Sequence, residues 1–153
     1  GRSPRLEDLQ RLRYTQMVLK ESLRLFPPVW GIGRETLRDV QLGEYRLPAG
    51  TNVFISQWVT QRDPRYFDRP DDFLPERWTE GFEKRLPKFA YFPFGGGPRV
   101  CIGASFAMME ATLLLATISQ RFRLALLAGH PVIPFASAAL RPERGIRVRL
   151  HKR

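Results

Sequence analysis

The chain has 153 residues, of which 43% are hydrophobic and 26% charged, and its formal net charge is +10. This composition is typical of a globular protein and excludes a disordered segment, and the sequence holds no run of ~20 uninterrupted apolar residues of the kind that spans a membrane. The 25 Lys and Arg residues are scattered and often stand beside acids, which argues against nucleic-acid binding and favours a basic face for an acidic protein partner.

The N-terminal third predicts a helix followed by short strands. Apolar residues at helical spacing indicate a helix over residues 6–25, with a local break near Arg13-Tyr14 and a stop at Phe26-Pro27-Pro28. Strand character follows, and Pro48-Ala49-Gly50 indicates a turn between antiparallel strands. We therefore expect one small sheet from residues 33–36, 40–42, 44–47 and 51–55.

The middle and the end of the chain differ in regularity. A short helix is predicted over 56–61, after which Pro64, Pro70 and Pro75 exclude a long helix or a central strand. We interpret residues 62–78 as an ordered, irregular segment, called the meander below, held by four aromatic side chains: Tyr66, Phe67, Phe73 and Trp78. Residues 102–122 predict a helix that is apolar on most sides, and residues 131–150 a closing hairpin. Such helices need more cover than one small sheet provides, so we expect the chain to be the C-terminal part of a larger protein.

Cys101 is the only cysteine, and it follows three glycines in the stretch FPFGGGPRVCIG, residues 92–103, called the cysteine loop below. A lone cysteine forms no internal disulfide, and with only two histidines in the chain a tetrahedral zinc site is disfavoured. The loop leads into a predicted helix N-terminus, whose unpaired N–H groups and positive dipole end favour the thiolate.

Several chemistries of that thiol can be weighed from the sequence. No histidine stands in an arrangement typical of a cysteine nucleophile, and GGGPRVC lacks the Lys-Ser/Thr of a phosphate-binding loop. A nucleophilic cysteine is thus disfavoured but stays open, and two interpretations of Cys101 are favoured: a small buried hydrophobe, or the sole protein ligand of a haem iron.

Five residues of this stretch resemble the haem-binding signature F-x-x-G-x-R-x-C-x-G of the cytochrome P450 family of haem-thiolate monooxygenases: Phe94, Gly97, Arg99, Cys101 and Gly103. The resemblance implies that Cys101 is the axial ligand of haem b and that Arg99 pairs with a haem propionate. It also implies that Phe94 packs near the sulfur and that Gly103 lets the following helix pass close to the porphyrin.

Two further motifs resemble the same family. Glu21 and Arg24 match its E-x-x-R helix, and Arg77, in PERW, matches the arginine of its P-E-R-F/W segment. By that resemblance the three form a structural triad that is scaffold and not catalytic; taken alone, Glu21 and Arg24 are also compatible with an ordinary surface ion pair. Gln61 departs from the family, in which a histidine often precedes Arg-Asp, so any polar contact of that side chain is left open.

Position along the chain gives weaker assignments. Arg34 resembles a second propionate-binding arginine, with a solvated strand residue as the alternative. Two apolar segments resemble the family's substrate-contacting stretches, with membership of the core as the alternative; the candidates are Val29, Trp30, Ile32, Phe135 and Ala136.

The resemblance covers residues 1–153 and implies the C-terminal segment of a single cytochrome P450 domain, mainly α with a small antiparallel β component, whose upstream part is absent. It implies a monooxygenase that inserts one oxygen atom from O2 into an apolar organic substrate, with electrons ultimately from NAD(P)H. No catalytic residue is expected in this segment, because the family's acid-alcohol pair lies upstream and no A/G-G-x-x-T match occurs here. The alternative is a non-catalytic or vestigial haem-binding module.

The basic residues fit the electron transfer that such an enzyme needs. A ferredoxin, a flavodoxin or a reductase domain is expected to dock on a basic proximal face represented by Lys84, Arg85, Lys88, Arg121 and Arg123. The excess of Arg over Lys favours a soluble, cytoplasmic protein of the bacterial type, while an upstream N-terminal membrane anchor stays open.

Overall fold

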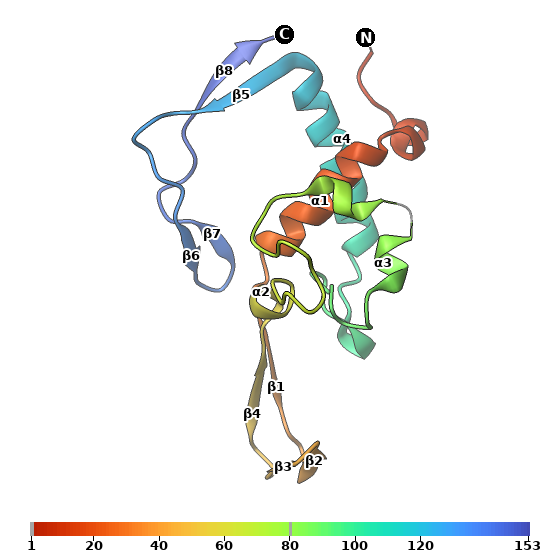
Figure 1. Cartoon of the computed structure of the whole chain (residues 1–153), viewed down its shortest axis with the longest axis vertical. Coiled ribbons are helices and arrows are strands. Elements are labelled where there is room, and N and C mark those ends of the chain that lie inside the picture. The colour runs from red at the N-terminus through yellow and green to blue at the C-terminus, as the bar shows by residue number, and fades with distance from the viewer. Residues whose placement is uncertain (1, 80) are drawn as a thin grey trace.

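The computed structural model describes residues 2–79 and 81–153, and its N-terminal part is helical (Figure 1). The 3-10 helix η1 (Leu6–Arg11) is followed by α1 (Arg13–Leu25), so the predicted helix and its break are confirmed, with the break at Leu12. The helix ends where the Phe26 amide donates to Ser22 O at 2.7 Å and two prolines without N–H groups follow.

Four short strands come next and form two ribbons that project from the body (Figure 1). Strand β1 (Ile32–Glu35) pairs antiparallel with β4 (Asn52–Ile55), and β2 (Val40–Leu42) pairs antiparallel with β3 (Tyr45–Leu47). The strand positions are thus confirmed, but the expectation of one sheet is wrong. The turn at residues 48–50 joins β3 to β4, which belong to different sheets.

The meander packs through aromatic rings. It follows α2 (Gln57–Thr60), whose N-cap Ser56 accepts from the Val59 amide, and it ends with η2 (Pro75–Trp78). Helix α3 (Phe82–Arg85) comes next along the chain. Phe67 and Trp78 are buried with ring centroids 6.5 Å apart. Phe73, also expected to hold the meander, is 48% exposed.

The second long helix is confirmed as α4 (Ala104–Arg121), which follows the cysteine loop and packs across α1 (Figure 1). Beyond it the single closing hairpin proves to be two nested antiparallel pairs. Strand β5 (Phe122–Leu126) pairs with β8 (Val148–Lys152), and β6 (Pro134–Ala136) pairs with β7 (Leu140–Pro142). The sequence pattern missed β5 because its apolar residues continue those of α4.

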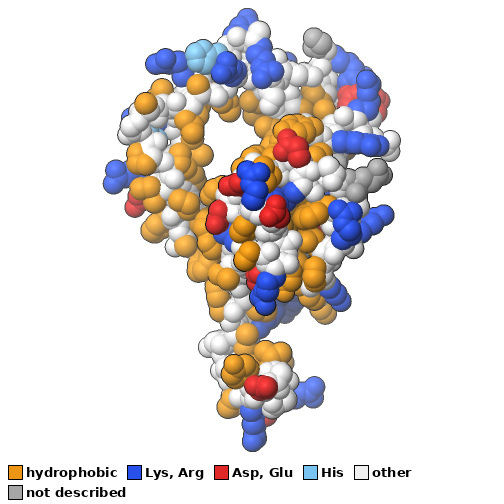
Figure 2. Space-filling view, viewed as in Figure 1, with side chains coloured by type: hydrophobic (Ala, Val, Ile, Leu, Met, Phe, Trp, Pro, Cys, Tyr) orange, Lys and Arg blue, Asp and Glu red, His pale blue; other side chains and the backbone are white. Residues whose placement is uncertain are grey.

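Polar residues dominate the deepest part of this chain. The largest fully buried side chains are Arg24, Phe67, Gln57, Gln61, Glu21, Thr112 and Pro27. Large apolar side chains are exposed over much of the surface, where Figure 2 shows hydrophobic atoms between scattered charges. Within residues 2–79 and 81–153, no helix combines the length and apolarity that crossing a membrane requires.

Candidate functional site

The cysteine loop is shaped by glycines and by its own backbone hydrogen bonds. Gly95 and Gly97 adopt φ values of +75° and +69°, which glycine reaches without the steric cost of a Cβ. The Gly95 amide donates to Phe92 O at 2.8 Å, and the Cys101 amide donates to Phe94 O at 3.0 Å. The loop therefore folds back on itself and holds Cys101 at a defined place.

Cys101 lies on the surface of this chain. Its thiol is exposed, and the neighbouring Val100 and Ile102 are 49% and 104% exposed. Helix α4 begins directly behind it, with Gly103 as the N-cap residue. An exposed thiol between two exposed apolar side chains is not a small buried hydrophobe, which removes that interpretation of Cys101 for this chain.

The surroundings of the loop fit a haem, which is a flat apolar disc with two carboxylates. A cavity of about 300 Å³ opens beside the loop. Its lining is mostly apolar and includes one cation; the members are Ile32, Arg34, Ile55, Thr60, Phe89, Phe92, Gly96 and Gly97. At Gly96 an added Cβ would lie 2.4 Å from the Phe89 ring, so this wall is already closely packed. Glycine at this position therefore lets the loop backbone pack directly against the Phe89 ring.

The two predicted propionate arginines are both exposed. Arg99 ends the 3-10 turn η3 (Gly97–Arg99), and its guanidinium has no hydrogen bond or ion pair with residues 2–79 or 81–153. Arg34 lies in β1 and donates only to the adjacent Gly33 O, at 2.7 Å. Both cations are thus available for carboxylates, which they bind with bidentate geometry.

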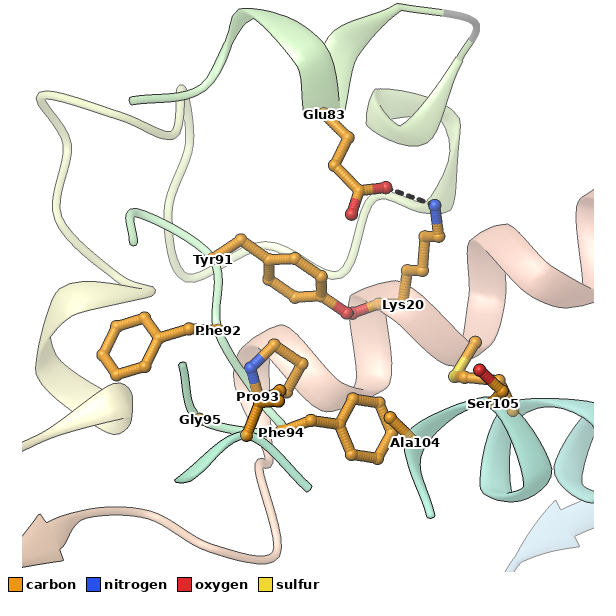
Figure 3. A pocket seen from close by; sticks show the side chains of 11 residues that line it. Lys20, Glu83, Tyr91, Phe92, Pro93, Phe94, Gly95, Ala104 and Ser105 are labelled. Carbon is orange, nitrogen blue, oxygen red and sulfur yellow. Dashed lines mark hydrogen bonds and ion pairs between the residues drawn. The ribbon is translucent and has the colours of Figure 1, made fainter. Parts of the chain in front are cut away.

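Phe94 lies on the other side of the loop, toward α1 and α4. Figure 3 shows Phe92 and Phe94 pointing to opposite sides of the loop backbone, with the Phe94 ring near Ala104. On this side lies a cavity of about 430 Å³, and Tyr91 and Lys20 line it together with Phe94. Tyr91 donates to Lys20 O at 3.2 Å, and burial raises the pKa of its hydroxyl, which therefore stays a neutral donor.

Glu21, Arg24 and Arg77 meet in a buried cluster beneath the meander. Glu21 Oε1 lies 2.9 Å from Arg24 Nη2 and 3.0 Å from Arg77 Nε, and the Glu21 and Arg24 side chains are fully buried. The geometry excludes an ordinary surface pair. Arg24 also donates to three backbone carbonyls of the 61–72 region, those of Gln61, Pro70 and Asp72.

Two members of this cluster were not anticipated from the sequence. The Trp78 indole donates to Glu21 Oε2 at 2.8 Å, and the Leu74 amide donates to Glu21 Oε1 at 2.9 Å. Burial alone would raise the pKa of Glu21, but hydrogen bonds from Arg24, Leu74, Arg77 and Trp78 outweigh it and hold that pKa below its ordinary value. The carboxylate is therefore charged at neutral pH and joins α1 to η2.

Gln61 is another buried residue whose contacts the sequence left open. Its side chain makes hydrogen bonds to Leu23, Arg24 and Phe92. Its partners are all backbone groups, so no side-chain pattern could have identified them.

The two candidate substrate-contacting segments lie together. The Trp30 indole donates to Ser137 O at 2.8 Å, and the Leu140 amide donates to Pro28 O at 2.7 Å. Val29 and Phe135 are 46% and 43% exposed, and neither belongs to the core of this chain. Segments more than 100 residues apart therefore form one partly apolar surface.

The basic residues divide into two groups. Lys84 and Arg85 end α3, and Lys88 follows shortly before the cysteine loop. Arg121 is the last residue of the 18-residue α4, and Arg123 lies in β5, which follows it. At 1.5 Å per residue, this end of α4 is about 27 Å from the end that follows the cysteine loop. Only the first group borders the loop.

Comparison with known proteins gives one consistent family. The family model described as Cytochrome P450 matches residues 1–150. Cyclooctatin synthase of Streptomyces melanosporofaciens is 48% identical over 134 residues, which cover 88% of this chain and 29% of that protein. From the same organism, cyclooctat-9-en-7-ol 5-monooxygenase is 44% identical over 124 residues, 81% of this chain and 27% of that protein.

A solved structure agrees in shape as well as in sequence. The retinoic acid bound cyanobacterial CYP120A1 superposes with a TM-score of 0.89 and 38% identity, covering 95% of this chain and 34% of that one. The chain thus spans about 30% of the length of the curated relatives it matches.

Proposed function

The chain belongs to the cytochrome P450 family, and on that premise we propose that it is the C-terminal portion of a haem-thiolate monooxygenase with a mainly α domain. One observation carries the proposal: the exposed Cys101 at the end of a glycine-shaped loop, within the stretch that the family model matches. Because the chain spans about 30% of its relatives' length, we assign the opposite wall of the haem pocket to residues outside it.

The chain's own residues would bind and orient the cofactor. Cys101 would supply the thiolate that binds the iron of haem b, and Arg99 and Arg34 would pair with the haem carboxylates. When bound, the haem supplies the activation of O2 from which one oxygen atom is inserted into the substrate. Gly97 gives the loop its turn through a positive φ, and Phe94 packs on the side of the loop that faces α1 and α4. Gly103, two residues after Cys101, is the N-cap residue of α4.

Glu21, Arg24 and Arg77 serve as scaffold in this proposal. Their buried cluster ties α1 to the meander, which leads through α3 into the cysteine loop. Polar clusters of this kind hold one arrangement, because any displacement leaves a buried charge without its partner.

The substrate is proposed to be an apolar organic molecule. The partly exposed apolar surface around Val29, Trp30, Ile32, Phe135 and Ala136 would contact it. The names of the two Streptomyces relatives, a cyclooctatin synthase and a monooxygenase, support oxidation of such a compound.

Electrons are proposed to come from NAD(P)H through an acidic partner: a ferredoxin, a flavodoxin or a reductase domain. Lys84, Arg85 and Lys88 border the cysteine loop and would form its docking face. Attraction between opposite charges accelerates such encounters, and added salt weakens it.

A reduced carbon monoxide difference spectrum of the full-length protein tests the proposal. The thiolate form should appear in the wild type and should be replaced by the form with a neutral ligand in Cys101→His. Arg123→His, a change of an exposed residue outside the site, is the matched control and should keep the thiolate spectrum. A wild-type spectrum that Cys101→His leaves unchanged would contradict the assignment.

A further inference from the structure

Gln61 directly follows α2, and its side chain is completely buried. Its Nε2 donates to Leu23 O at 3.0 Å and to Arg24 O at 3.1 Å. Its Oε1 accepts from the Phe92 amide at 2.9 Å. One side chain therefore joins the end of α1 to the beginning of the cysteine loop.

The two α1 carbonyl groups that Gln61 contacts have no backbone N–H donor within the helix. Leu23 and Arg24 lie in the last turn of α1, where carbonyl groups have no intrahelical donor. The residues four places farther along, Pro27 and Pro28, would donate to these carbonyls in a longer helix, but proline has no N–H group. The two amide protons of Gln61 satisfy these two carbonyls.

The Oε1 atom of Gln61 is connected to Cys101 through a short series of backbone hydrogen bonds in the cysteine loop. Phe92 is held at its amide by Gln61 and at its carbonyl by the Gly95 amide, at 2.8 Å. Pro93 follows with a restricted φ, and the next residue, Phe94, accepts from the Cys101 amide at 3.0 Å. A shift of Phe92 would therefore move the carbonyl that holds Cys101.

We propose that Gln61 is a positioning residue: its amide fixes the cysteine loop against the end of α1 and so sets the place of the Cys101 sulfur. This inference rests on the proposed role of Cys101 as iron ligand. The Arg24 guanidinium donates to Gln61 O at 2.9 Å, so the same residue also connects the loop with the buried Glu21 cluster.

A primary amide suits this position better than other side chains. It offers two donors and an acceptor at once, which the three backbone groups require. A neutral imidazole offers one donor and one acceptor, so histidine would leave one α1 carbonyl unpaired. Leucine would leave all three groups unpaired.

Gln57 provides a matched control one helical turn earlier. It has the same side chain and is equally buried, but neither its Nε2 nor its Oε1 has a partner among the described residues. Replacing Gln57 by leucine changes the same volume and polarity without removing a hydrogen bond to the loop.

The experiment compares Gln61→Leu and Gln57→Leu in the full-length, haem-loaded protein. Gln61→Leu should speed hydrogen exchange at the Phe92 amide by about tenfold, as expected for one lost buried hydrogen bond, and should convert part of the ferrous carbon monoxide complex to the form without thiolate. Gln57→Leu should keep the wild-type spectrum and should not speed exchange at the Phe92 amide. Gln61→His should give intermediate exchange, because it keeps one donor and one acceptor.

Equal Phe92 exchange and equal spectra for Gln61→Leu and Gln57→Leu would overturn the proposal. If Gln61→Leu does not fold, Gln61→Met carries the test, because its flexible side chain has a similar volume and offers the Phe92 amide no oxygen acceptor; wild-type protection of the Phe92 amide in Gln61→Met would overturn the proposal in the same way. Failure of the monooxygenase proposal is separate, because it would show as a wild-type protein without the thiolate spectrum, whatever the exchange rates.

Discussion

Replacing Glu21 by glutamine tests the buried cluster that holds the meander. The change keeps the shape of the side chain and removes the charge. In the wild type the two carboxylate oxygens accept five hydrogen bonds, from Arg24 Nε and Nη2, the Leu74 amide, Arg77 Nε and Trp78 Nε1. In Glu21→Gln one oxygen becomes an NH2 group that faces these donors, and two arginines lose their buried counter-ion.

The expected cost follows from the burial of the partners. The Arg24 side chain is 0% exposed and that of Arg77 7%, so water cannot replace the carboxylate. Removing one member of a buried ion pair costs about 3–5 kcal/mol. A domain is stable by only about 5–15 kcal/mol, so Glu21→Gln should lose a large part of the free energy of unfolding.

The assay is denaturant unfolding of the full-length protein followed by tryptophan fluorescence. Glu83→Gln is the matched control, because Glu83 pairs with Lys20 while 52% and 33% of the two side chains are exposed. That change should cost about 0–1 kcal/mol. If Glu21→Gln costs no more than Glu83→Gln, the reasoning about the buried cluster is refuted.

The same variant has a defined pH dependence. The folded-state pKa of Glu21 is lowered, so its contribution is present above the pKa of the unfolded chain and is lost as the pH falls through the folded-state value. The difference in unfolding free energy between wild type and Glu21→Gln should therefore shrink below about pH 4. A difference that stays constant from neutral to acid pH would contradict this assignment.

Three further outcomes follow from the structure. Gln57→Leu should raise the free energy of unfolding by about 1–3 kcal/mol, because a buried amide without partners among the described residues is removed; a loss of stability in thermal unfolding would contradict this. Lys84→Glu with Lys88→Glu should slow reduction by an acidic partner in stopped-flow measurements at low salt, whereas Arg123→Glu, far from the loop, should not; equal rates for all variants would exclude the docking face. Residues 1–153 expressed alone should give little soluble, haem-loaded protein, because residues such as Ile102, Phe106 and Leu114 are exposed; a stable one-to-one haem complex would refute this.

Much of the fold could be read from local patterns. Both long helices, the four strands of the projecting ribbons and the short helix after them lie where periodicity and turn residues predict them. Local patterns failed where pairing is remote. The pairing of β1 with β4 instead of a common sheet, and the existence of β5, depend on partners about 20 or more residues away.

In the site, too, some features could be predicted from the sequence, and others depend on contacts between remote segments. The glycine loop and Cys101 stand out in the sequence itself, whereas the meeting of Glu21 with Arg24 and Arg77 could be anticipated only from the resemblance to the family, because nothing local links residue 77 to residues 21 and 24. Gln61 could be noticed only as a departure from the family. Its role depends on two carbonyls at the end of α1 and one amide of the loop, which are backbone groups without a sequence signature.

The central claim is that Cys101 holds the iron of a bound haem, and iron X-ray absorption on the full-length protein tests it most directly. The wild type should show one sulfur atom among the iron's nearest ligands, and Cys101→His should show only nitrogen or oxygen. A wild-type iron without a sulfur ligand, or a sulfur ligand that persists in Cys101→His, would contradict the account.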